Sequence, residues 1–93
     1  MKVRVSCEDK YECQKLASLI FIKDSNETYI TKILNIVENE VVMELKDKSA
    51  HSVVLKDKYQ VEVFADFIQS VLEKKHKIIS TDIFEQDIEM VKG

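Results

Sequence analysis

A pattern that occurs twice constrains the fold of this chain more than any other feature. DKYECQKLASLI begins at Asp9, and DKYQVEVFADFI begins at Asp57. In each copy the aspartate is followed three residues later by Glu12 or Gln60, the spacing of a helix N-cap and its capping-box partner. Apolar residues then recur at helical spacing, and an alanine falls at the same place in both copies. The pattern therefore predicts two amphipathic helices with sharp starts.

The segments on either side of these helices have the alternation that is typical of β-strands. Segments 3–7 and 51–55 precede the helices. After each helix come two β-rich runs separated by an acidic turn, NIVENEVVME at 35–44 and DIFEQDIEMV at 82–91. Segment 27–37 also fits a helix, but its β-branched content favours a strand. Both halves thus have the predicted order strand, helix, strand, turn, strand.

This order predicts a single α+β domain over residues 1–93. Its expected form is an antiparallel-rich sheet with two helices on one face, a ferredoxin-like arrangement in which βαββ is repeated twice. Residues 1–47 and 48–93 could be an internal duplication, or two similar units shaped by the same physical requirements. Tyr11 and Tyr59, in the first helical turns, could pack on the sheet edge or face a ligand, and their matched positions in the two copies favour packing.

The composition excludes several classes of protein. Glycine-rich phosphate loops need several glycines, and the chain has one, Gly93, and no proline. A net charge of −3 argues against a general polyanion binder. No apolar run approaches the ~20 residues that cross a bilayer, and the start lacks a signal-peptide core, so we expect a cytoplasmic protein. Many lysines and isoleucines with one arginine, Arg4, suggest an AT-rich genome of bacterial or phage origin.

The residues that could carry chemistry do not form a recognisable site. Cys7 and Cys13 stand where the other half has Leu55 and Val61, so both are expected to be core residues. Two cysteines alone cannot complete a zinc site, and a disulfide is not expected in the cytoplasm. A Cys7–His51 pair is conceivable but lacks an orienting group. We therefore assign no catalytic, metal-binding or cofactor-binding residue, and we expect no cofactor.

The basic residues that follow the second helix do not predict a nucleic-acid site. His76 belongs to a short run of cations at 74–77, which follows the second helix. This run could form a local anion patch, but it lacks the interleaved aromatic residues that stack on nucleic-acid bases. Nucleic acid is therefore not an expected partner.

The side of the sheet away from the helices carries the remaining candidate site. The strand alternation predicts an exposed apolar patch there, formed by Ile33, Val37, Val42, Val54, Phe84 and Val91. A patch of this kind on a water-soluble protein usually marks an interface. The sequence therefore predicts a small non-enzymatic interaction protein, a regulator, inhibitor or assembly subunit, that binds a protein partner or itself as a homodimer. The alternative is a regulatory domain that senses a small molecule at a dimer seam.

Overall fold

The computed structural model describes residues 1–22 and 27–93. The elements in this part of the chain are β1 (Lys2–Ser6), α1 (Lys10–Ile20), β2 (Ile30–Val37), β3 (Glu40–Leu45), β4 (Ala50–Val54), α2 (Lys58–Leu72), β5 (Ile78–Phe84) and β6 (Asp87–Lys92). The predicted order in each half, strand, helix, strand, turn, strand, is confirmed. Segment 27–37 contributes strand β2 and not a helix.

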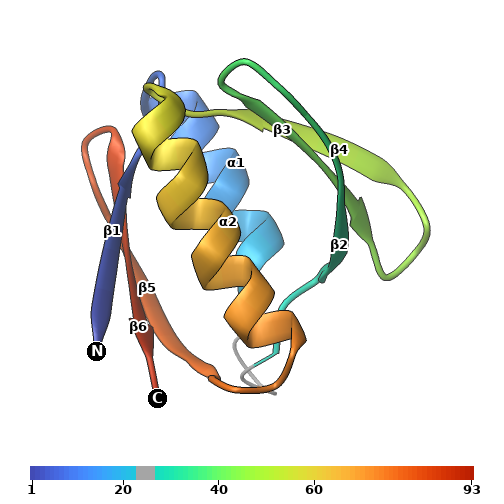
Figure 1. Cartoon of the computed structure of the whole chain (residues 1–93). Helices are drawn as coiled ribbons and strands as arrows, with labels where there is room; N and C mark the ends of the chain where they lie inside the picture. The colour runs from blue at the N-terminus through green and yellow to red at the C-terminus, as the bar shows by residue number, and fades with distance from the viewer. Residues whose placement is uncertain (23–26) are drawn as a thin grey trace.

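The strands form two antiparallel sheets of three strands each. Sheet 1 has the order β1-β6-β5 and sheet 2 the order β2-β3-β4. Figure 1 shows both helices as a middle layer between the two sheets. The prediction of an α+β fold with antiparallel strands is confirmed. The prediction of one sheet with both helices on one face is wrong, and the ferredoxin-like arrangement is not confirmed because the strand order differs.

The two sheets arise because the halves of the chain exchange their first strands. Strand β1 pairs with the β5–β6 hairpin of the second half, and β4 pairs with the β2–β3 hairpin of the first half. Where β1 and β4 end, Cys7 and Leu55 form an antiparallel bridge. Beside it, Glu8 N donates to Val54 O at 3.0 Å, and Lys56 N donates to Ser6 O at 3.0 Å. The two sheets are thus joined at one corner of the molecule.

Both helices begin at the aspartates that the repeat predicts. Asp9 Oδ1 accepts from Glu12 N at 2.9 Å, and Asp57 Oδ1 accepts from Gln60 N at 3.0 Å. These bonds satisfy backbone donors that have no partner inside the helix. The Glu12 and Gln60 side chains, however, reach the opposite half of the chain instead of their own N-caps.

The core lies in the two layers of contact between the helices and the sheets. The alternation of the strands predicts eight residues that face the helices; Val3 is partly buried, and the other seven are buried: Val5, Cys7, Val41, Met43, Leu45, Val53 and Leu55. Helix α2 buries Val61, Phe64, Phe67 and Ile68, and at 3.6 residues per turn Val61 and Phe67 lie about 120° apart around its axis. Two sheets on opposite sides of a helix require an apolar arc wider than the single stripe of a surface helix. Burying side chains of this size contributes about 1.5–3 kcal/mol each.

The two halves match residue by residue apart from one insertion. Ile30 pairs with Leu45 as Ile78 pairs with Lys92, and both hairpin turns place a glutamate, Glu38 or Glu85, in the left-handed region, with φ of 54° and 58°. Strand β5 has one irregularity, near its start, whereas β2 has a second between Ile33 and Asn35. Leu34 is therefore the extra residue of β2, accommodated as a bulge.

Candidate interaction surface

The outer face of sheet 2, which points away from the helices, carries few charges. The register sets Val42 at its centre, opposite Asn35 on β2 and Ser52 on β4. Val37 and Val54 flank Glu40 at one end of the face, and Glu44 lies between Lys32 and Ala50 at the other end. Val37 is 53% exposed and Leu34, in the bulge, 46%. Uncharged side chains thus form one continuous row across all three strands, Asn35-Val42-Ser52, between rows that contain Glu40 and Glu44.

The equivalent face of sheet 1 is built on the same backbone pattern but is charged. Its outward residues include Lys2 and Arg4 on β1, Glu89 and Asp87 on β6, and Asp82 on β5. Lys2 Nζ lies 3.7 Å from Glu89 Oε1, and Arg4 Nε lies 3.1 Å from Asp87 Oδ2. At the positions equivalent to Lys2, Arg4, Asp82 and Glu89, sheet 2 has Ala50, Ser52, Asn35 and Val42, whereas Lys32 and Glu44 of sheet 2 stand where sheet 1 has Ser80 and Val91.

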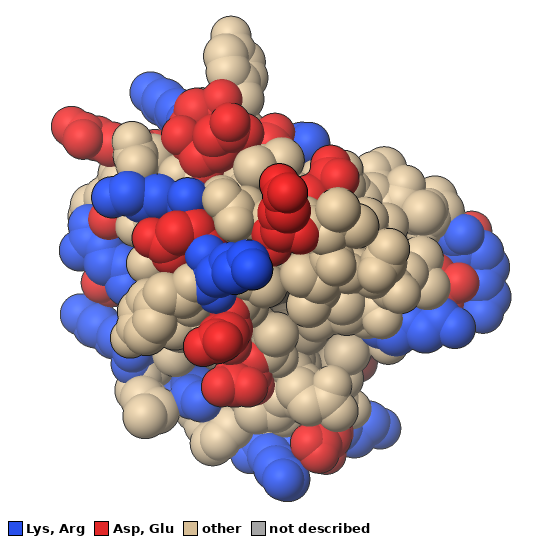
Figure 2. All heavy atoms as spheres, turned by 45° about the horizontal axis from the view of Figure 1, so that its top comes forward, with Lys and Arg blue, Asp and Glu red and all other residues tan. Residues whose placement is uncertain are grey.

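The contrast between the two faces is visible on the molecular surface. Figure 2 shows a broad area without charged atoms to the right of the centre, on the side on which Figure 1 places sheet 2, and charged atoms at the far right edge. Lysine and carboxylate atoms alternate on the left, the side of sheet 1. The outer faces of the two sheets, which are made by equivalent strands, therefore differ in their charged side chains. Charged side chains oppose dehydration, so the outer face of sheet 2 is easier to dehydrate than that of sheet 1.

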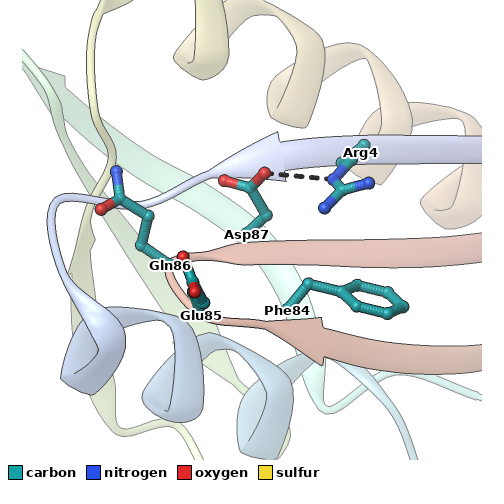
Figure 3. A pocket seen from close by; sticks show the side chains of 5 residues that line it. All are labelled: Arg4, Phe84, Glu85, Gln86 and Asp87. Carbon is teal, nitrogen blue, oxygen red and sulfur yellow. Dashed lines mark hydrogen bonds and ion pairs between the residues drawn. The ribbon is translucent and has the colours of Figure 1, made fainter.

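A shallow hollow lies at the hairpin end of sheet 1. Its volume is about 340 Å³, and it is lined by Arg4, Phe84, Glu85, Gln86 and Asp87 (Figure 3). The Arg4 guanidinium stacks 5.0 Å above the Phe84 ring while it pairs with Asp87. This guanidinium is thus already neutralised and stacked within the protein, which leaves it little capacity to hold an anionic ligand.

The six residues of the predicted patch lie in three places. Val37, Val42 and Val54 share the outer face of sheet 2. Phe84 and Val91 lie on the outer face of sheet 1, on the other side of the helix layer. Ile33 faces inward and packs against the core. The sequence analysis missed Leu34, because a bulge interrupts the alternation that assigns residues to faces.

The two tyrosines that were expected to pack on the sheet edge are on the surface. Tyr11 is 80% exposed and Tyr59 is 68% exposed, so this prediction is wrong. Both occupy the second residue of a helix, on the side opposite the buried residues. They therefore add apolar surface to the end of the molecule at which both helices start.

The two cysteines are buried core residues, as the repeat predicts. Both side chains are fully buried and free. Burial raises the pKa of the Cys7 thiol and, to a smaller extent, that of Cys13. A thiol with a raised pKa stays protonated at neutral pH and is a poor nucleophile.

The histidines do not join these thiols. His51 lies at the exposed start of β4, where its Nε2 is 3.0 Å from Ser49 Oγ, whereas Cys7 is bridged to Leu55 beyond the end of that strand. His76 Nδ1 lies 3.3 Å from the Gly93 backbone oxygen. Among residues 1–22 and 27–93, no three His, Cys, Asp or Glu side chains are grouped to hold a metal ion.

Comparisons with known proteins add no relationship. No family model, curated protein or solved structure matches this chain. Neither helix in the described residues is long and apolar enough to cross a membrane.

Proposed function

We propose that this protein is a non-enzymatic, cytoplasmic interaction protein that binds another protein chain through the outer face of sheet 2. One observation carries the proposal: the equivalent face of sheet 1 has charged side chains at four positions where sheet 2 has Ala50, Ser52, Asn35 and Val42.

The simplest alternative explanation is that the fold itself requires few charges on an outer face, and sheet 1 contradicts it. The fold tolerates Lys2, Arg4, Asp82 and Glu89 on an outer face, where they are solvated and partly ion-paired. The fold therefore does not require an uncharged outer face. An interface does, because its centre must be dehydrated, and charged residues are depleted there.

A chain that covers the exposed apolar side chains of this face also gains hydrophobic free energy. Leu34 and Val37 are about half exposed, and Val42 and Val54 are partly exposed. Complete burial of a valine or leucine is worth about 1.5–3 kcal/mol, so a covering chain recovers a fraction of this at each position. Sheets that pack face to face do so about 10 Å apart, a spacing that side chains of this size can fill.

Site-specific photo-crosslinking in the native cell tests this proposal. A photoreactive amino acid replaces Val42 in one variant and Glu89, the equivalent residue of sheet 1, in the control. We expect position 42 to give a discrete protein adduct and position 89 to give none. Adducts of equal yield from both positions, or none from position 42, would contradict the proposal.

A further inference from the structure

The end of the molecule at which both helices start is strongly acidic. It consists of the two helix starts and the two hairpin turns, residues 7–12, 36–40, 55–62 and 83–87, which gather at the top of Figure 1. Backbone hydrogen bonds from Cys7 N to Gln86 O and from Leu55 N to Asn39 O hold these segments together. They carry nine carboxylates and three lysines, a net charge of −6. We call this the acidic end.

The opposite end is basic in the part of the chain that the structure describes. It contains Lys2, Glu27, the β3–β4 turn at 46–49, residues 73–77 and Lys92. Lys46 Nζ lies 2.8 Å from Glu27 Oε2, and Lys46 with the nearby Lys74 lowers the pKa of Glu27, which ties the turn to the end of α2. Seven lysines and three carboxylates give a net charge of +4. We call this the basic end.

Strand β3 connects the two ends across the middle of the outer face of sheet 2. The hairpin turn with Glu38 precedes β3 at the acidic end, and the turn with Lys48 follows it at the basic end. Halfway between these residues lie Val42, the centre of the uncharged face, and its neighbour Met43. The row of uncharged residues around Val42 is thus bordered by opposite charges at the two ends of the strands.

We infer that the chain that covers this face is a second copy of the same protein, packed face to face with its strands reversed. This inference rests on the proposed function and names its partner. A two-fold axis in the plane of the face, crossing β3 near Val42, brings the acidic end of each copy toward the basic end of the other. The same patch meets itself, so the pair is closed and cannot grow into a filament.

Charge selects this arrangement over the other two-fold packing of the same faces. An axis parallel to the strands sets acidic end against acidic end and basic end against basic end. Surface charges act over a Debye length of about 8–10 Å at moderate salt, so the ends influence the packing without direct contact. The Glu44 carboxylate does not disturb the centre, because it lies 3.9 Å from Lys32 Nζ and accepts from Thr31 Oγ1 at 3.1 Å.

The size of the face sets the strength of the pair. Three strands about 4.8 Å apart and about six residues long, with a rise of ~3.3 Å, cover roughly 300 Å² in projection. A stable specific dimer buries about 800 Å² on each partner. The dimer is therefore weak and reversible, forms at high protein concentration, and dissociates when the salt concentration is raised.

Sedimentation equilibrium of the purified chain over a range of protein and salt concentrations tests the inference. We expect a monomer–dimer equilibrium that weakens several-fold in high salt. Val42→Asp should abolish the dimer, whereas the control Val91→Asp, on the outer face of sheet 1, should leave it unchanged. Circular dichroism confirms that both variants are folded.

A charge exchange tests the orientation of the two copies. Glu38→Lys and Lys48→Glu each place like charges together in the reversed packing, and both residues hold left-handed turn positions, so the backbone constraint is unchanged. We expect each variant alone to dimerise several-fold more weakly than the wild type. An equimolar mixture should dimerise at least as well as the wild type, because both pairs of ends are then complementary.

Three outcomes would overturn the inference. If the mixture associates no better than either variant alone, the copies are not packed with strands reversed. If the wild-type protein is monomeric at every concentration while position 42 crosslinks to a protein of different mass, the partner is another protein, and only the proposed function stands. A wild-type dimer that survives Val42→Asp would mean that another surface forms the contact.

Discussion

The side chains of Glu12 and Gln60 join the two halves of the chain, and we predict that each is a major contributor to stability. Glu12 Oε1 accepts from Val54 N at 2.8 Å, and Gln60 Oε1 accepts from Ser6 N at 2.9 Å. Both donors are partly buried backbone groups at the end of an edge strand. A capping-box residue would normally bond its own N-cap, so these bonds are specific to the exchanged strands.

Gln60→Ala removes the acceptor and leaves the Ser6 N–H without its partner. A buried donor that loses its partner costs about 1–3 kcal/mol. The total stability expected for a chain of this length is roughly 5–14 kcal/mol, so the loss is a large part of it. For a domain of this size 1 kcal/mol shifts Tm by about 4–8 °C, so we expect Tm to fall by roughly 4–24 °C.

Glu12→Ala should cost slightly more, because Glu12 also pairs with Lys15 at 3.1 Å. A pair at this spacing on a helix is worth about 0.2–0.5 kcal/mol. Glu12→Gln keeps the acceptor oxygen and loses only the charge, so it should cost less than Glu12→Ala. The comparison separates the hydrogen bond to the opposite half from the local ion pair.

Urea denaturation followed by circular dichroism measures these effects, with Gln14→Ala as the control. Gln14 is exposed on α1, and its substitution should change the free energy of unfolding by less than about 0.5 kcal/mol. If Gln60→Ala and Gln14→Ala have the same midpoint, the bond to Ser6 contributes nothing, and the exchanged strands are held by other contacts.

Four further predictions follow from single residues. Asp9→Ala and Asp57→Ala should each lower the free energy of unfolding by about 0.5–2 kcal/mol, the usual cost of an N-cap, and unchanged denaturant midpoints would contradict this. Cys7→Val and Cys13→Val should each cost less than ~1.5 kcal/mol, since they exchange buried apolar side chains of similar volume; loss of cooperative unfolding in either variant would argue against it. Burial raises the pKa of both thiols, so above about pH 9 the unfolded chain loses protons that the folded chain keeps. Stability should therefore fall as the pH rises above 9, and urea midpoints measured across this range should fall less steeply in Cys7→Val. Glu85→Gly relieves about 1–2 kcal/mol of left-handed backbone strain, whereas the greater freedom of the unfolded chain costs about 0.5–1 kcal/mol. Thermal melting should therefore show equal or higher stability. A clear loss of stability would mean that the Glu85 side chain has a structural role.

The position of the candidate surface was only partly predictable from the sequence. Strand alternation correctly placed Val37, Val42 and Val54 on an outward face. It also grouped them with Phe84 and Val91, which belong to the other sheet. Alternation decides whether a side chain points inward or outward, but it carries no information about which sheet a strand joins. The bulge at Leu34 shifts the alternation by one residue, so Ile33 faces the core.

The local chemistry of the sequence determined the elements of this protein and their inward faces. Aspartates with a partner three residues later start the helices, and β-branched runs form the strands. Alternation places Val5, Val41 and Val53 in the core. The sequence determines these features because each depends only on residues that are neighbours in the chain.

Only the tertiary structure decided that β1 pairs with β6 and β4 with β3. One six-stranded sheet and two three-stranded sheets bury the same strand residues, so strand alternation cannot separate them. One local signal pointed to a second sheet. Phe67 lies beside the apolar stripe of α2 that a single sheet would cover, so the apolar surface of this helix is wider than one sheet requires. The choice depends on hydrogen bonds between strands far apart in the sequence and on a second sheet that covers the other side of each helix.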